Sequence, residues 1–208
     1  MIDLYTWGTP NGKKVSIMLE EVGLEYATHP INILKDEQFA PSFLKISPNN
    51  KIPAIVDPNG PSGTPISIFE SGAILIYLAE KTDSALLPHN ERKRMDTLQW
   101  LMFQMGGLGP MLGQANHFLK FAAEDVPYGK NRYRTEAHRI YGVMDQRLGE
   151  VAYVAGDDYS IADIATYPWI MRWEWHEIDL EAQCPNVWRW MNAITSRPAV
   201  QRGMAVPG

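Results

Sequence analysis

Two short segments in the first half of the chain constrain its fold more than any other feature. Residues 47–57, Ser-Pro-Asn-Asn-Lys-Ile-Pro-Ala-Ile-Val-Asp, place an Ile-Pro pair before a β-branched run. Residues 66–78, Ile-Ser-Ile-Phe-Glu-Ser-Gly-Ala-Ile-Leu-Ile-Tyr-Leu, indicate a strand that ends where an amphipathic helix begins. An X-Pro bond is the usual place for a cis peptide. We therefore expect Ile52-Pro53 to turn a backbone edge outward, where another chain can pair with it.

The junction Glu70-Ser71 adds polar groups to this backbone edge. A helix that starts at Ser71 offers a hydroxyl, backbone N–H groups and a positive dipole end to a carboxylate. Glu70 can receive an ammonium group. A small peptide, with an extended backbone, an amine and a carboxylate, would fit all of these. The alternative is that Pro53 is an ordinary loop proline and Ser71 a plain N-cap.

The order of the expected elements in the first 82 residues indicates an α/β domain. These are a strand over 2–6, a helix over 13–22 closed by Gly23, a strand over 25–33, a short helix over 41–46, strands over 54–56 and 66–69, and a helix over 71–81. The first part needs a parallel crossover, and the second is an antiparallel hairpin followed by a helix. This order resembles the thioredoxin fold.

The rest of the chain is predicted to be helical. One apolar stripe comprises Met95, Leu98, Leu101, Met102 and Met105, and another comprises Tyr133, Ala137, Tyr141, Met144 and Leu148. We expect residues 106–110, Gly-Gly-Leu-Gly-Pro, to interrupt the first stripe. Ser160 and Asp163 form a variant of the capping box, and a last helix over 185–197 should end before Pro198. The predicted organisation is a thioredoxin-like domain over 1–82, a linker over 83–90 and an all-α domain over 91–208.

Composition narrows the classes of function. The net charge is −5 and the 19 Lys and Arg residues are scattered, which argues against a nucleic-acid surface. The longest apolar run, 73–79, is far shorter than the roughly 20 residues of a membrane span, so no membrane partner is expected. The chain begins directly in a predicted strand and has a single cysteine, Cys184. Both features favour a reducing, cytoplasmic location.

The turn after the first strand carries hydroxyl and amide groups in place of thiols. In thioredoxins and glutaredoxins this turn contains C-x-x-C, but here it is Thr9-Pro10-Asn11-Gly12. Proline is tolerated at the first helical position, so Thr9 is predicted to cap the helix and Asn11 to lie in its first turn. A bound thiol at this place would meet the Thr9 hydroxyl, backbone N–H groups and the helix dipole. These features stabilise thiolates. The alternative is that Thr9 is only a cap.

Together these segments resemble the glutathione transferase family, and within it the Nu class and the wider group around the yeast nitrogen regulator Ure2. Residues 99–100, Gln-Trp, and 106–114, Gly-Gly-Leu-Gly-Pro-Met-Leu-Gly-Gln, extend the resemblance into the helical part. The resemblance implies a glutathione-dependent disulfide reductase, with glutathione as co-substrate and no metal. It also implies that Thr9 and Asn11 are catalytic, and that glutathione is bound by Gln38, Lys51, the Ile52 backbone, Glu70, Ser71 and Arg132.

The remaining candidates have weaker support. Tyr5 is a rival hydroxyl donor, since some glutathione transferases use tyrosine, but it lies in mid-strand. The five histidines lack metal-ligand spacing, so no metal site is expected. Cys184 precedes Pro185 at a helix start, far along the chain from Thr9, and is interpreted as structural. Trp7 and Phe118 are candidates for a pocket that binds an apolar co-substrate.

The predicted function is therefore that of a thiol transferase that reduces small disulfides, with possible peroxidase and weak conjugating activity. Its predicted partners are glutathione, a small disulfide, peroxide or electrophile, and a second copy of the chain in a homodimer. The alternative is a non-catalytic binding or regulatory module that kept the fold. A glutaredoxin mechanism would need a cysteine near residue 9, and the sequence has none there.

Overall fold

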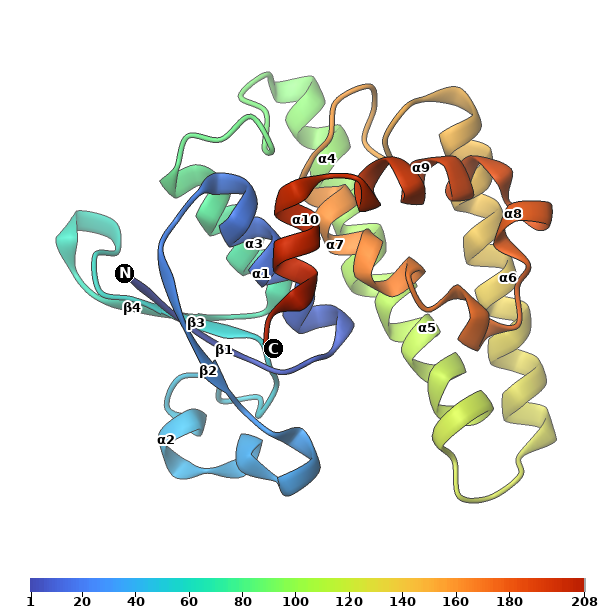
Figure 1. The fold of residues 1–208 in the computed structure, drawn as a ribbon, viewed down its shortest axis with the longest axis horizontal. Coiled ribbons are helices and arrows are strands. Elements are labelled where there is room, and N and C mark those ends of the chain that lie inside the picture. The colour runs from blue at the N-terminus through green and yellow to red at the C-terminus, as the bar shows by residue number, and fades with distance from the viewer. Residues whose placement is uncertain (208) are drawn as a thin grey trace. The chain divides into compact units, whose positions relative to one another are not determined.

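The computed structural model describes residues 1–207, which divide into two compact units (Figure 1). The first comprises Met1–Ala85 together with the segment that starts at Arg197. The second is Leu86–Ser196.

A four-stranded mixed sheet forms the centre of the first unit. Its strands are β1 (Ile2–Thr6), β2 (Tyr26–Pro30), β3 (Ala54–Asp57) and β4 (Ile66–Phe69), in the order β2-β1-β3-β4. β1 pairs parallel with β2 and antiparallel with β3, and β3 pairs antiparallel with β4. The predicted parallel crossover and hairpin are confirmed, and with them the thioredoxin-like fold. β2 is shorter than the predicted 25–33, because the Asn32 side chain caps a 3₁₀ turn at Ile33–Lys35.

Helices cover both faces of this sheet. Ile2, Leu4 and Thr6 alternate as the buried residues of β1 and face the core. α1 (Pro10–Val22) and α3 (Ser71–Lys81) pack against each other over this core. On the other face Tyr5 lies near Phe43 of the short helix α2 (Pro41–Leu44), with ring centroids 6.2 Å apart.

The ends of α1 follow from its sequence. The Thr9 side chain accepts a hydrogen bond from the Gly12 N–H, and Pro10 occupies the first turn, as predicted. At the other end Gly23 has φ of 66°, a left-handed conformation that glycine adopts without a Cβ clash. The first turn of α1 is therefore held at a fixed place beyond β1.

The last helix, α10 (Pro198–Ala205), differs from the sequence analysis, which assigned 91–208 to the helical domain. α10 packs on α1 in the first unit. A Cβ on Gly203 would lie only 2.5 Å from the Ile17 Cα, and the Ser16 hydroxyl donates to the Gly203 carbonyl at 2.7 Å. The absence of a side chain at Gly203 thus permits the close approach of the two helices. Pro198 was expected only to end a helix, but it also lies in the first turn of the next one.

The second unit is helical. Its α-helices are α4 (Glu91–Phe103), α5 (Gly109–Asn116), α6 (Pro127–Glu150), α7 (Ile161–Ile170), α8 (Leu180–Gln183) and α9 (Pro185–Thr195). The expected interruption at 106–110 is wrong. π-helical turns at Gln104–Leu108 connect α4 to α5 without a break, and Pro110 lies in the first turn of α5.

The two predicted apolar stripes have different environments. In α6, Ala137, Tyr141, Met144 and Leu148 are buried and Tyr133 is half-buried, as the pattern predicts. In α4, Leu101 is buried but Met95 and Met102 are 63% and 51% exposed. α4 therefore presents apolar side chains that this unit does not cover.

No helix within residues 1–207 is long and apolar enough to cross a membrane. The same residues contain no group of three or more His, Cys, Asp or Glu side chains placed to hold a metal ion.

Candidate functional site

The register of the sheet brings the predicted site segments of the first unit to one end. Tyr5 pairs with Ala54, and Ala54 pairs with Phe69, so these residues form a row across β1, β3 and β4. One step beyond this row lie the turn to Thr9, the Ile52-Pro53 bond and the Glu70-Ser71 junction. β2 runs parallel to β1, so the segment that leads to Gln38 leaves from the same end.

The Ile52-Pro53 peptide bond is cis, as predicted. Ser47 is buried, and its hydroxyl donates to the Lys51 carbonyl at 2.8 Å, which fixes the loop before the proline. Pairing of β3 begins at Ala54, so the backbone of Ile52 lies outside the ladder. Its backbone polar groups are therefore not used by the ladder, and their pairing with an extended ligand stays a prediction.

Thr9 combines a structural role with an available proton. Its Oγ1 accepts from the Gly12 N–H at 3.3 Å, while the hydroxyl hydrogen can still be donated outward. A Cβ on Gly12 would lie 2.3 Å from the Trp7 carbonyl oxygen, so only glycine lets the helix start so close to this loop. The half-buried Asn11 lies in the first turn beside them. This helix end offers N–H groups and a positive dipole to an anion.

The Glu70-Ser71 junction has an unusual backbone. Glu70 has φ of 72° and ψ of 111°, which non-glycine residues rarely adopt. Its side chain is exposed and makes no capping hydrogen bond to α3. Ser71 is 4% exposed and starts α3. Such backbone conformations concentrate where a site requires a side chain in a particular direction.

Lys14 is a buried ionisable residue next to the predicted ligand residue Ser71, and the sequence analysis did not single it out. Its side chain is 1% exposed, and its Nζ donates to the Ser71 Oγ at 3.3 Å. Burial lowers the pKa of Lys14 from 10.5 to about 7, while the Glu70 carboxylate favours the charged form. Helical spacing places Lys14 four residues before Met18, on the apolar face of α1, and this is the signal that could have found it.

The remaining predicted ligand residues lie in different surroundings. The Oε1 of Gln38 is buried and has no hydrogen-bond partner within residues 1–207, so it could accept a ligand N–H. Lys51 is exposed beside Ile52. Arg132 is exposed on α6 in the second unit, with its Cζ 5.9 Å from the Tyr133 ring centroid. Its role as a glutathione ligand stays a prediction that rests on the resemblance.

Two rival groups have unsuitable environments. Tyr5 stacks on His29 with ring centroids 4.8 Å apart, and burial together with Asp3 raises its pKa. A phenol of raised pKa on the far face of the sheet is a poor partner for a thiolate near α1. Cys184 is buried, and burial followed by the charge of Asp145 raises its pKa to about 11. It is therefore protonated near neutral pH and a weak nucleophile.

The two aromatic candidates are only partly buried. Trp7 lies in the loop before Thr9, and its carbonyl accepts from the Thr9 N–H at 2.6 Å. Phe118 stacks on Tyr133 with centroids 5.3 Å apart, and a Cβ on Gly129 would lie 2.7 Å from its ring. Phe118 thus packs tightly on α6, and a pocket for a co-substrate at either residue stays a prediction.

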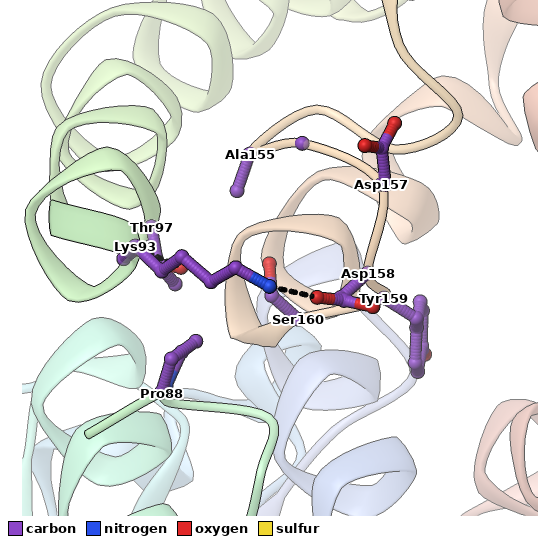
Figure 2. A pocket seen from close by; sticks show the side chains of 9 residues that line it. Pro88, Lys93, Thr97, Ala155, Asp157, Asp158, Tyr159 and Ser160 are labelled. Atoms are coloured by element: carbon purple, nitrogen blue, oxygen red, sulfur yellow. Dashed lines mark hydrogen bonds and ion pairs between the residues drawn. The ribbon is translucent and has the colours of Figure 1, made fainter. Parts of the chain in front are cut away.

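A separate cavity lies in the second unit, between α4 and the loop before α7 (Figure 2). Lys93 extends toward Asp158, and its Nζ lies 2.8 Å from the carboxylate. Thr97 donates to the Lys93 carbonyl, and Ser160 belongs to the cap of α7. Since Lys93, Asp158, Thr97 and Ser160 each have a hydrogen-bond partner within the fold, we assign no ligand to this cavity.

Comparison with known proteins identifies the family. Models of the glutathione S-transferase N-terminal and C-terminal domains match residues 1–80 and 111–198. The disulfide-bond oxidoreductase YfcG of Escherichia coli is 51% identical over 205 residues, covering 98% of this chain and 94% of YfcG. YghU of the same organism, also named a disulfide-bond oxidoreductase, is 40% identical, covering 99% of this chain and 74% of YghU.

Solved structures agree with this result. A glutathione transferase from Pseudomonas putida with one glutathione disulfide bound per subunit superposes with a TM-score of 0.94 at 47% identity, covering all of this chain and 92% of that one. One from Burkholderia graminis with two glutathione molecules per subunit has the same TM-score at 49% identity, covering 99% and 88%. These relatives are consistent with the predicted Nu class. The chain belongs to the glutathione transferase family.

Proposed function

We propose that this chain is a glutathione-dependent disulfide oxidoreductase, a thiol transferase in which the ligand supplies the reactive thiol. One observation carries the proposal. The cis Ile52-Pro53 bond, the Glu70-Ser71 junction and the first turn of α1 lie at one end of the sheet, yet the only cysteine is buried and held protonated. The site offers a place for a peptide thiol and has no thiol of its own.

The relatives support the same reaction. YfcG and YghU are named disulfide-bond oxidoreductases, and the Pseudomonas putida and Burkholderia graminis structures contain glutathione disulfide or two glutathione molecules. A site that takes two thiols or one disulfide suits a cycle between these two states.

The reaction has two thiol–disulfide exchanges. The thiolate of a first glutathione attacks the substrate disulfide, so that one S–S bond forms and another breaks, and a substrate thiolate leaves and takes up a proton. A second glutathione thiolate attacks the mixed disulfide, releasing the second substrate thiol and glutathione disulfide. Two glutathione molecules are oxidised and one disulfide is reduced. The attacking thiol must be ionised for each step.

Thr9 and the first turn of α1 stabilise the ionised thiol of the bound glutathione. The Thr9 hydroxyl can donate to the thiolate, while the first N–H groups of α1 and its dipole favour negative charge there. Asn11 is proposed to act beside Thr9. Glu70 receives the ammonium group of glutathione and Ser71 its neighbouring carboxylate. The Ile52 backbone pairs with the cysteinyl unit, and Gln38 and Lys51 meet the glycine end.

We further propose a homodimer in the cytoplasm. The exposed Met95 and Met102 lie seven residues apart on one face of α4 and supply apolar surface for a second copy. Sedimentation of a monomer at micromolar concentration would remove this part of the proposal.

Equilibrium titration of glutathione and of its disulfide tests the function, followed by turnover of a model disulfide, a hydroperoxide and an aryl halide. Saturable binding with disulfide turnover is expected. Without saturable binding at millimolar glutathione, the proposal is wrong. If the chain instead bound a stoichiometric protein partner and turned over no thiol substrate, it would be a binding module.

A further inference from the structure

A distant part of the chain, α10, contacts the helix turn that begins at Thr9 (Figure 1). The Lys13 ammonium group donates to the Val206 carbonyl at 2.6 Å, and the Ser16 hydroxyl donates to the Gly203 carbonyl at 2.7 Å. Lys13 and Ser16 are three residues apart, so they share one face of α1. Val206 is the C-cap of α10. The C-terminal end of α10 is therefore bonded to the first turn of α1.

The two helices run in opposite directions. At the other end of the pair Arg197, the N-cap of α10, makes two hydrogen bonds of 2.7 and 2.8 Å to the Glu21 carboxylate. The positive N-terminal end of α1 thus lies beside the negative C-terminal end of α10. Lys13 places a cation at that end of α10, where it offsets the charge of the carbonyl groups. The positive end of α1 is then left available to an anion.

We propose that α10 holds the thiol-binding turn of α1 in place, and that Lys13 is the positioning residue that connects them. The inference rests on the proposed function, because it requires the thiol of glutathione to bind at this turn. Lys13 itself touches no ligand. It acts through Thr9 and through the N–H groups that begin α1.

The backbone connects Lys13 directly to Thr9. The Lys13 N–H donates to the Thr9 carbonyl at 3.0 Å, and the Gly12 N–H donates to the Thr9 Oγ1 at 3.3 Å. Lys13 and Thr9 therefore belong to one hydrogen-bonded turn, and a shift of Lys13 moves the hydroxyl that is proposed to face the thiolate. Hydrogen bonds weaken steeply when their angle is lost, so a small shift would reduce the stabilisation of the thiolate.

The position of Lys13 has a cost that its contact with α10 offsets. A cation in the first turn of a helix is unfavourable for that helix. Lys13 is also half-buried, and the loss of hydration lowers its pKa. The Val206 carbonyl supplies the compensating hydrogen bond. Close packing continues at Gly203, where a Cβ would lie 2.5 Å from the Ile17 Cα, so α1 has little freedom to move against α10.

The test separates positioning of the turn from stability of the fold. Lys13→Met removes the ammonium group, whereas Lys13→Arg keeps the charge. Arg197→Met is the matched control, since it breaks an ion pair at the far end of the same two helices. For each variant, the ultraviolet absorbance of the thiolate against pH gives the pKa of the thiol of bound glutathione. Equilibrium titration gives the affinity for glutathione disulfide, and urea unfolding gives the stability.

Lys13→Met should raise the pKa of the bound thiol and reduce disulfide turnover near neutral pH by about three- to tenfold, the size of a charge effect at a helix end. Affinity for glutathione disulfide, which has no thiolate, should stay the same. Lys13→Arg should recover most of the turnover, and Arg197→Met should lose stability but keep the thiol pKa of the wild type. Ser16→Ala should raise the thiol pKa by a smaller amount, and it replaces Lys13→Met if that variant does not fold.

Two results would overturn the inference and leave the proposed function standing. In the first, Lys13→Met, or Ser16→Ala in its place, loses stability while the thiol pKa stays that of the wild type, so α10 supports only the fold. In the second, the variant weakens binding of glutathione disulfide as strongly as it reduces turnover, so the loss lies in binding. If the wild type binds no glutathione, or binds it with a thiol of ordinary pKa, both proposals fail.

Discussion

Each of the two units buries an ionisable side chain, and the two differ in what surrounds them. Asp163 in the helical unit accepts four hydrogen bonds, from the Val154 and Ser160 N–H groups, the Ser160 hydroxyl and the Trp190 indole. Lys14 in the thioredoxin-like unit donates to Ser71, at the end of a helix predicted to face a ligand. A buried charge whose partners all lie within the fold supports the fold. Lys14, in contrast, lies next to Ser71, which is a proposed glutathione ligand.

The strongest challenge to this comparison is the removal of Asp163. Asp163→Ala leaves the Trp190 indole and two backbone N–H groups without their acceptor. The cost should be roughly 3–5 kcal/mol in the free energy of unfolding, as for other disrupted buried networks. Urea unfolding measures it, while glutathione affinity of the folded fraction should stay the same. A stable variant that has lost glutathione binding would make Asp163 a functional residue and end the contrast.

Thr9→Ala should have the opposite effect to Asp163→Ala, with a large loss of turnover and a small loss of stability. Loss of one donor to the thiolate should reduce turnover of a model disulfide by roughly a hundredfold. Loss of the cap should cost only about 1 kcal/mol in stability. Steady-state kinetics with saturating glutathione give the first number and urea unfolding the second. Thr9→Ser, which keeps the hydroxyl, is the control and should retain most of the turnover. Unchanged turnover in Thr9→Ala would reduce Thr9 to a helix cap.

The pH dependence of stability sharpens the comparison, because the two buried groups act in opposite directions. Lys14 has a pKa lowered to about 7, so above pH 7 the unfolded chain holds a proton that the folded chain has released. The contribution of Lys14 to the free energy of unfolding therefore rises with pH, by up to about 1.4 kcal/mol per pH unit. The rise ends when the lysine of the unfolded chain also deprotonates.

Burial raises the pKa of Asp163 to about 6, so between pH 4 and 6 the folded state binds the extra proton and the free energy of unfolding falls with rising pH.

The measurement for Lys14 compares the free energy of urea unfolding of the wild type and of Lys14→Met at pH 7.5 and 9.5. The wild type should gain stability relative to the variant at the higher pH. If the free energy of unfolding changed equally in both proteins between these pH values, the pKa of Lys14 would not be lowered by folding.

The sequence predicted those parts of the molecule that depend on local rules. Thr9 as a cap, Gly23 as a helix end and the capping box at Ser160 and Asp163 are each set by a few neighbouring residues, and all are confirmed. The cis bond at Pro53 is confirmed as well. The site segments also follow from the order of the strands, since antiparallel pairing of β3 with β1 and β4 fixes which loops share one end of the sheet.

Features that depend on distant packing could not be predicted in the same way. α10 packs on α1 because Gly203 lets Ile17 approach, and no local pattern connects residues so far apart in the chain. The π-helical turns preserve the helix through Gly106, where composition indicated a break. Lys14 was missed because an ammonium group on an apolar face conflicts with the usual interpretation of lysine as a surface residue.

The most direct test of the ligand-supplied thiol is disulfide reduction by a chain that has no cysteine. Cys184→Ala removes the only thiol of the protein. The account predicts that its kcat/KM for a model disulfide, measured with glutathione as the reductant, equals that of the wild type. It also predicts that mass spectrometry of the wild type during turnover detects no glutathione attached to Cys184. If Cys184→Ala abolished the activity while Thr9→Ala retained it, the mechanism would be contradicted.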